Sequence, residues 1–206
     1  MRVLITGYEP AYGIKKTPSG EIAKAFADGS TFLNNVETFG VVLPQSFAYQ
    51  SERLISELGV IRPEFLFILG STFKHGKVRL EEFALNVIDT KVGDNSKIPI
   101  TNRMVNQRGP AALRSNVNID GVMRKIEDPE SVVRSYHAGT HVCNALYYDT
   151  LDYLSRFSPA TKCLMIHVPF PVEYGIMDDP ETGLSFPEIS HIVRSIITST
   201  IMTHAI

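Results

Sequence analysis

Cys143 is the side chain of this sequence best suited to covalent chemistry. It lies in SYHAGTHVCNALYYDTL, residues 135–151, after a Gly139-Thr140 pair and before an amphipathic run. If Gly139 and Thr140 form the turn and the cap, Cys143 falls in the first turn of a helix. Free amides and the helix dipole favour a thiolate there. The same amides would stabilise an oxyanion, so the stretch predicts a nucleophile.

The alternatives for Cys143 are a buried filler residue and a metal ligand. Free cysteines are usually small buried hydrophobic residues, and Cys163 fits that description because it lies inside the apolar segment TKCLMIHVP. The sequence contains no Cys-x-x-Cys pair, no His-Glu-x-x-His motif and no Gly-rich phosphate loop. We therefore predict neither a metal nor a cofactor.

The base that would serve Cys143 is expected to be His167. His141 lies two positions before the thiol, and residues two apart on a helix do not face each other. His137 precedes the turn and would need a sharp bend to reach. His167 ends a strand whose backbone Pro169 restricts, so it can approach from a neighbouring strand, although a core histidine is the alternative. His191 and His204 lie on the last predicted helix and are expected to be surface or packing residues. The role of His75, in a polar loop, stays open.

Strands and helices alternate along the chain and must bring these side chains together. Apolar runs predict strands at 2–6, 38–44, 64–70, 131–137 and 161–169, with strand or mixed structure at 78–89. Helical spacing and caps predict helices at 19–27, 47–59, 119–127, 140–157 and 186–206. Residues 91–117 read as an irregular excursion, a lid or an interface. The alternation predicts an α/β fold with a mostly parallel sheet covered on both faces.

In such a sheet, sites collect where strands end and helices begin. Three reactive segments meet that condition: the loop after 64–70, the turn from 131–137 into the Cys143 helix, and the end of 161–169. We therefore expect Cys143 and His167 to be neighbours.

Bulk properties limit the remaining choices. The chain has 206 residues, 44% hydrophobic and 20% charged, which suits one domain, 1–206, with a substantial core. A net charge of −2 gives no basic surface for nucleic acid. Two cysteines form no disulfide framework, and no apolar run suits a secretory signal or a membrane span. We predict a cytoplasmic protein that binds neither nucleic acid nor membrane.

Motifs along nearly the whole chain resemble one known family. They are VLITGYEP at 3–10, VVLP at 41–44, LEEFALNVIDTKVGDN at 80–95, RGPAAL at 108–113, AGTHVCN at 138–144 and MIHVPFPVE at 165–173. In order and spacing they resemble pyroglutamyl peptidase I, or pyrrolidone-carboxylate peptidase, a family of cysteine peptidases. The resemblance implies a single three-layer α/β/α domain, phosphorylase/hydrolase-like, that assembles as a tetramer or dimer. It also implies removal of an N-terminal pyroglutamyl residue without a cofactor.

The resemblance also assigns catalytic roles. The family's Cys–His–Glu triad maps to Cys143, His167 and Glu81, with Glu81 orienting the imidazole and stabilising its charge. Glu82, where the family usually has Arg, is expected to be a solvated charge. Neighbouring strand residues point to opposite faces, so only one of the two acids serves the site.

The departures from the family pattern fall where the family binds its substrate. The family loop Gly-Phe-x-Pro-Phe-Gly-Gly reads GYEPAYG here, an Asn is replaced by Thr17, and an aromatic residue by His141. GSTFKHG stands where the family commonly has a Gln and, later, an Arg. The implied substrate-binding residues are Tyr8, Ala11, Tyr12, Thr17, Ser71, His75 and His141. We expect a more polar, differently shaped pocket and weaker activity on simple pyroglutamyl amides.

Three functions remain open. The first is hydrolysis of a pyroglutamyl peptide. The second is the same triad acting on another acyl amide or lactam, with water or an amine capturing the thioester. The third is a binding protein that kept the fold and lost activity, against which the intact Cys143, His167 and Glu81 count.

Overall fold

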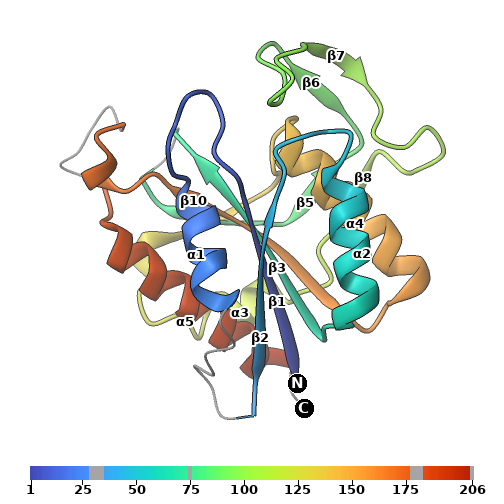
Figure 1. Ribbon diagram of the computed structural model, residues 1–206. Helices are drawn as coiled ribbons and strands as arrows, with labels where there is room; N and C mark the ends of the chain where they lie inside the picture. The colour runs from blue at the N-terminus through green and yellow to red at the C-terminus, as the bar shows by residue number, and fades with distance from the viewer. Residues whose placement is uncertain (28–34, 74–75, 177–182, 205–206) are drawn as a thin grey trace.

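The computed structural model describes residues 1–27, 35–73, 76–176 and 183–204 and has the expected alternation of strands and helices (Figure 1). Its strands are β1 (Arg2–Tyr8), β2 (Glu37–Leu43), β3 (Phe65–Thr72), β4 (Val78–Glu81), β5 (Phe83–Leu85), β6 (Ile88–Thr90), β7 (Ile100–Arg103), β8 (Ala112–Arg114), β9 (Val132–Ser135) and β10 (Lys162–Pro169). Its helices are α1 (Pro18–Ala27), α2 (Gln50–Ile61), α3 (Ile119–Met123), α4 (Val142–Phe157) and α5 (Phe186–His204).

A six-stranded sheet in the order β2-β1-β3-β10-β4-β9 forms the centre of the molecule. The first four strands are parallel, as predicted, whereas β4 runs antiparallel to β10 and β9 runs parallel to β4. The segment 131–137 therefore does not end at the same edge as β3 and β10, and that part of our expectation is wrong. Residues 136–141 lead from β9 to the start of α4.

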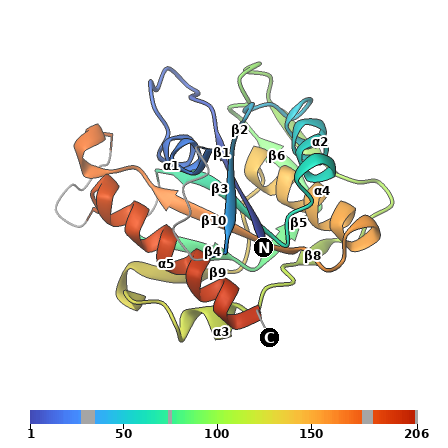
Figure 2. The ribbon, with the colours of Figure 1, turned by 60° about the horizontal axis from the view of Figure 1, so that its bottom comes forward.

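Helices cover both faces of the sheet, which gives the predicted three-layer α/β/α arrangement (Figure 2). Alternate residues of β3 enter different cores because strand side chains alternate between faces. Phe65, Phe67 and Leu69 pack with α1, α3 and α5. Leu66 and Ile68 pack with α2 and α4. The helix that carries Cys143 therefore packs in the second of these cores.

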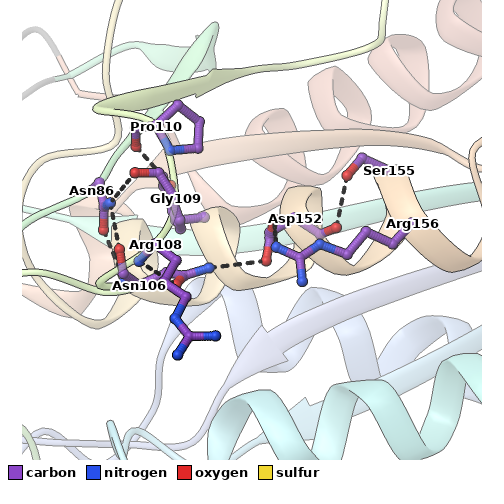
Figure 3. Close-up of polar contacts among 9 residues, drawn as sticks. Asn86, Asn106, Arg108, Gly109, Pro110, Asp152, Ser155 and Arg156 are labelled. Carbon is purple, nitrogen blue, oxygen red and sulfur yellow. Dashed lines mark hydrogen bonds and ion pairs between the residues drawn. The ribbon is translucent and has the colours of Figure 1, made fainter.

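The excursion at 91–117 is less irregular than expected. It contributes β7 and β8, which pair antiparallel with β6 and β5, and the β6–β7 pair extends beyond the main sheet (Figure 1). Its return is tied to α4 by the amides in Figure 3. Asn86 Nδ2 donates to the carbonyls of Asn106 (2.8 Å) and Gly109 (3.2 Å), and Asn106 Nδ2 donates to Asp152 (3.2 Å). The Asn106–Asp152 bond holds the excursion against the Cys143 helix, and the Asn86 bonds hold it against the link between β5 and β6.

The last helix, α5, ends at His204 in the described part of the chain, and residues 205–206 lie outside it. Within the four described ranges, no helix combines the length and apolar character needed to cross a bilayer.

Candidate active site

Cys143 lies in the first turn of α4, which begins at Val142. The residue that precedes the helix is His141, not Thr140, and the Thr140 hydroxyl instead donates to the Asp89 carbonyl (2.7 Å). Ala145 is the residue whose amide donates back to the His141 carbonyl (3.0 Å). The amides before it have no intrahelical acceptor, as at any helix start. The expected cap was therefore one residue off, but Cys143 sits among the free amides.

His167 and Glu81 extend from Cys143 as a hydrogen-bonded chain. His167 Nδ1 lies 2.9 Å from Glu81 Oε1, and His167 Nε2 and Cys143 Sγ lie 2.7 and 3.0 Å from the same point, where a Cβ atom at Gly70 would be. Burial lowers the pKa of His167, but the hydrogen bonds and charges of Cys143 and Glu81 outweigh it and raise the pKa to about 10. The imidazole is therefore held in its charged form at neutral pH.

The Glu81 carboxylate is buried, with 1% of its surface exposed. Burial raises its pKa, but hydrogen bonds to His167 and Ser135 and the charges of His167 and Arg79 outweigh this, so the net shift is downward. Glu81 therefore carries a negative charge where it can orient and stabilise an imidazolium.

Glu82 corrects one expectation. It is not a solvated charge, because only 5% of it is exposed. Glu82 Oε1 lies 2.6 Å from Arg114, and Oε2 lies 3.6 Å from Arg134. The sequence could not locate these partners, because β8 and β9 reach Glu82 only in the folded chain. Glu81 and Glu82 do have different partners, as adjacent strand residues should.

A cavity of about 60 Å³ opens beside the Cys143 side chain. Five of the residues that we expected to bind the substrate line this cavity. They are Tyr8, Ala11, Tyr12, Thr17 and Ser71. Thr17 also shapes the scaffold, because its hydroxyl accepts from the Gly20 amide at the start of α1 and donates to the Tyr8 carbonyl. His75 falls outside the described residues.

Sequence reasoning missed two aromatic residues of this cavity. Phe73 and Phe170 line it and stack on each other, with ring centroids 4.3 Å apart. Each directly follows a strand, Phe73 after β3 and Phe170 after β10. The expectation that sites gather at the ends of these strands, applied to aromatic residues, would have identified both.

His141 was expected at the substrate but does not line the cavity, and it contacts Tyr12 of the cavity wall. Its Nε2 lies 2.6 Å from the Gly93 carbonyl and 3.2 Å from the Tyr12 hydroxyl. Burial lowers the pKa of His141, despite the opposing effect of the Gly93 carbonyl. Gln45 Nε2 also donates to the Tyr12 hydroxyl (3.2 Å). The cavity thus has an aromatic wall and a polar edge.

Gly70 is a further residue that sequence reasoning missed. It lies opposite His167 in the β3–β10 pairing. A Cβ atom at Gly70 would lie 2.7 Å from His167 Nε2 and 3.0 Å from Cys143 Sγ. The absence of a side chain at this position is therefore what lets thiol and imidazole meet.

We predict that Gly70→Ala slows alkylation of Cys143 by iodoacetamide by about tenfold to a hundredfold. The added methyl group displaces His167, and a hydrogen bond to a charged group contributes about 1.5–3 kcal/mol. Gly59→Ala in α2 is the matched control, because nothing lies within 4 Å of its new methyl group. Parent-like alkylation in Gly70→Ala would contradict the crowding argument.

Cys163 lies apart from the candidate site. Cys163 is fully buried in the core between the sheet and α2 and α4, and burial raises the pKa of its thiol. Among the residues that the structure describes, no three histidine, cysteine, aspartate or glutamate side chains gather as a metal site would require.

Comparisons with known proteins place the chain in one family. Residues 1–205 match the sequence model of the family described as pyroglutamyl peptidase. The pyrrolidone-carboxylate peptidase of Thermococcus litoralis is 30% identical over 172 residues, which cover 82% of this chain and 76% of that protein. The Bacillus cytotoxicus enzyme of the same name is 28% identical, covering 91% and 86%. The solved structure of a pyrrolidone carboxyl peptidase variant from Pyrococcus furiosus superposes with a TM-score of 0.90 at 27% identity, covering 98% of this chain and 99% of that one.

Proposed function

The chain belongs to the pyroglutamyl peptidase family of cysteine peptidases, and we propose that it hydrolyses the amide bond after an N-terminal pyroglutamyl residue. Its catalytic residues are Cys143, His167 and Glu81. The observation that carries the proposal is that His167, hydrogen-bonded to Glu81, meets Cys143 over Gly70 beside a small cavity. The substrate is a peptide or a small acyl amide.

The reaction follows from this arrangement. Before substrate binds, His167 already holds the proton of Cys143 as an imidazolium, and the thiolate attacks the amide carbonyl. The free amides at the start of α4 receive the negative charge on the carbonyl oxygen. The imidazolium then protonates the leaving amine, and a thioester forms on Cys143. Neutral His167 next takes a proton from water, which attacks the thioester and releases the acid and the thiol.

The cavity suits a small acyl group. At about 10–15 Å³ for each water-sized group, its volume of about 60 Å³ admits roughly four to six such groups. A five-membered lactam is of that size. Ala11 removes the ring that the family usually has, but Tyr12, Phe73 and Phe170 supply other rings around the same space. Flat groups pack well against such aromatic walls.

The polar edge of the cavity favours a second candidate. Tyr12, His141 and Gln45 offer hydrogen-bonding groups there, which would suit a different acyl amide or lactam. If an amine rather than water captured the thioester, the same residues would catalyse acyl transfer.

The decisive experiment is hydrolysis of a fluorogenic pyroglutamyl amide beside matched prolyl and glutamyl amides. We expect cleavage of the pyroglutamyl amide only, because the prolyl amide lacks the lactam carbonyl and the glutamyl amide carries charge. The altered pocket should place kcat/KM roughly two to three decades below that of the Thermococcus litoralis relative. Cleavage of another acyl amide, with the pyroglutamyl amide untouched, would instead support the second candidate.

Three further properties remain predictions. They are a single domain over residues 1–206, assembly as a homo-oligomer and a cytoplasmic location. Light scattering of the purified protein would test the oligomer.

A further inference from the structure

Tyr8 lies beside the cavity onto which the proposed nucleophile opens. Tyr8 ends β1, is 4% exposed and lines the same cavity as Cys143. Its backbone is held at both polar groups: the amide donates to Ser19 Oγ (3.3 Å), and the carbonyl accepts from the Thr17 hydroxyl. The position of the ring, and so of the hydroxyl, is therefore set by the fold.

Gln50 is the hydrogen-bond partner of the Tyr8 hydroxyl. The Tyr8 hydroxyl donates to Gln50 Oε1 (3.1 Å), and Gln50 Nε2 donates to the Val142 carbonyl (3.0 Å). Because that carbonyl can only accept, it fixes which end of the amide faces Tyr8. Gln50 is 1% exposed, so water does not compete at this site. The hydroxyl proton is donated to the Gln50 oxygen, and the Cys143 sulfur is a second acceptor on the same cavity.

We propose that Tyr8 is a further catalytic residue whose hydroxyl donates to the Cys143 sulfur while it is a thiolate and to Gln50 once the sulfur is acylated. Gln50 is then a positioning residue that accepts the hydrogen bond of the Tyr8 hydroxyl while Cys143 is acylated. The inference rests on the proposed function of Cys143. No covalent bond changes at Tyr8, and its proton stays on the phenol oxygen throughout.

The chemistry of the two acceptors sets the direction of this exchange. A thiolate is charged, and hydrogen bonds to charged acceptors are about twice as strong as neutral ones. A thioester sulfur is a weak acceptor, so the Gln50 oxygen is then preferred. Burial and the neighbouring Cys143 raise the pKa of Tyr8 well above its usual range, which keeps the donor protonated. The phenylalanine that the family usually has here could not donate.

The test is the pH dependence of Cys143 alkylation by iodoacetamide in Tyr8→Phe. Loss of a hydrogen bond to the thiolate should move the alkylation midpoint upward by about one to two pH units. Tyr148→Phe is the matched control, because Tyr148 is also buried but donates to the Pro110 carbonyl (2.7 Å), away from the sulfur. An unchanged midpoint in Tyr8→Phe would overturn the inference.

Gln50→Met provides an independent measurement of opposite sign. Without Gln50, the Tyr8 proton has only the sulfur to bind, so the midpoint should fall. In the double variant with Tyr8→Phe it should match Tyr8→Phe alone. If Gln50→Met moved the alkylation midpoint equally in the parent and in Tyr8→Phe, the proposed switch of the Tyr8 hydroxyl between the two acceptors would be overturned. If Cys143 of the parent protein reacted slowly with iodoacetamide, and His167→Ala did not change that rate, the proposed function would be refuted together with this inference.

Discussion

Cys143→Ser is expected to lower kcat for pyroglutamyl amide hydrolysis by about four to six orders of magnitude, as loss of a covalent nucleophile does in other triad enzymes. A serine hydroxyl is far less acidic than a thiol, and this site is built to receive its proton on an imidazole held by a single carboxylate. Thermal unfolding should change little, because Cys143 is only partly buried. Steady-state kinetics and calorimetry on the same preparation measure both quantities.

Cys163→Ser is the matched control for that prediction. It makes the same atomic change in a cysteine that is fully buried. Placing a hydroxyl in an apolar core costs about 1–3 kcal/mol of stability, while kcat should stay within twofold of the parent value. The nucleophile assignment fails if Cys143→Ser retains parental turnover, or if the two variants lose activity equally.

His167→Ala is expected to lower kcat by about two to four decades, the usual contribution of general acid–base catalysis. It should also slow iodoacetamide alkylation, because Cys143 loses the group that takes its proton. His141→Ala is the comparison: its ring contacts Gly93 and Tyr12, so it should change KM more than alkylation. A larger loss of alkylation rate in His141→Ala would reverse the choice of base.

The same residue predicts the alkaline limit of activity. Because the pKa of His167 is raised to about 10, the imidazolium that protonates the leaving amine is present below that pH and lost above it. The kcat/KM of the parent should therefore fall as the pH rises through about 10. Glu81→Gln should move this limit to lower pH, since the Glu81 hydrogen bond and charge contribute to the raised pKa. A limit that stays in place would separate Glu81 from the titration of His167.

Local sequence patterns predicted the central strand, the Cys143 helix and the difference between the two cysteines. The apolar run of 64–70 and the helical spacing of 140–157 depend only on nearby residues, and both appear as β3 and α4 with small shifts at their ends. The contrast between Cys143 at a helix start and Cys163 inside a strand is also local. For that reason the sequence distinguished the two thiols, and strand-end reasoning made His167 a neighbour of Cys143 before any fold was known.

Tertiary structure alone decided which distant groups meet. The sequence of β9 does not encode its direction, which depends on pairing with β4. Glu82 is buried because Arg114 and Arg134 arrive from other strands. The contacts of the Tyr8 hydroxyl depend on α2 and α4 meeting at the end of β1. Periodicity reports whether a residue faces a core, but hydrogen-bond partners depend on the register and packing of segments far apart in the chain.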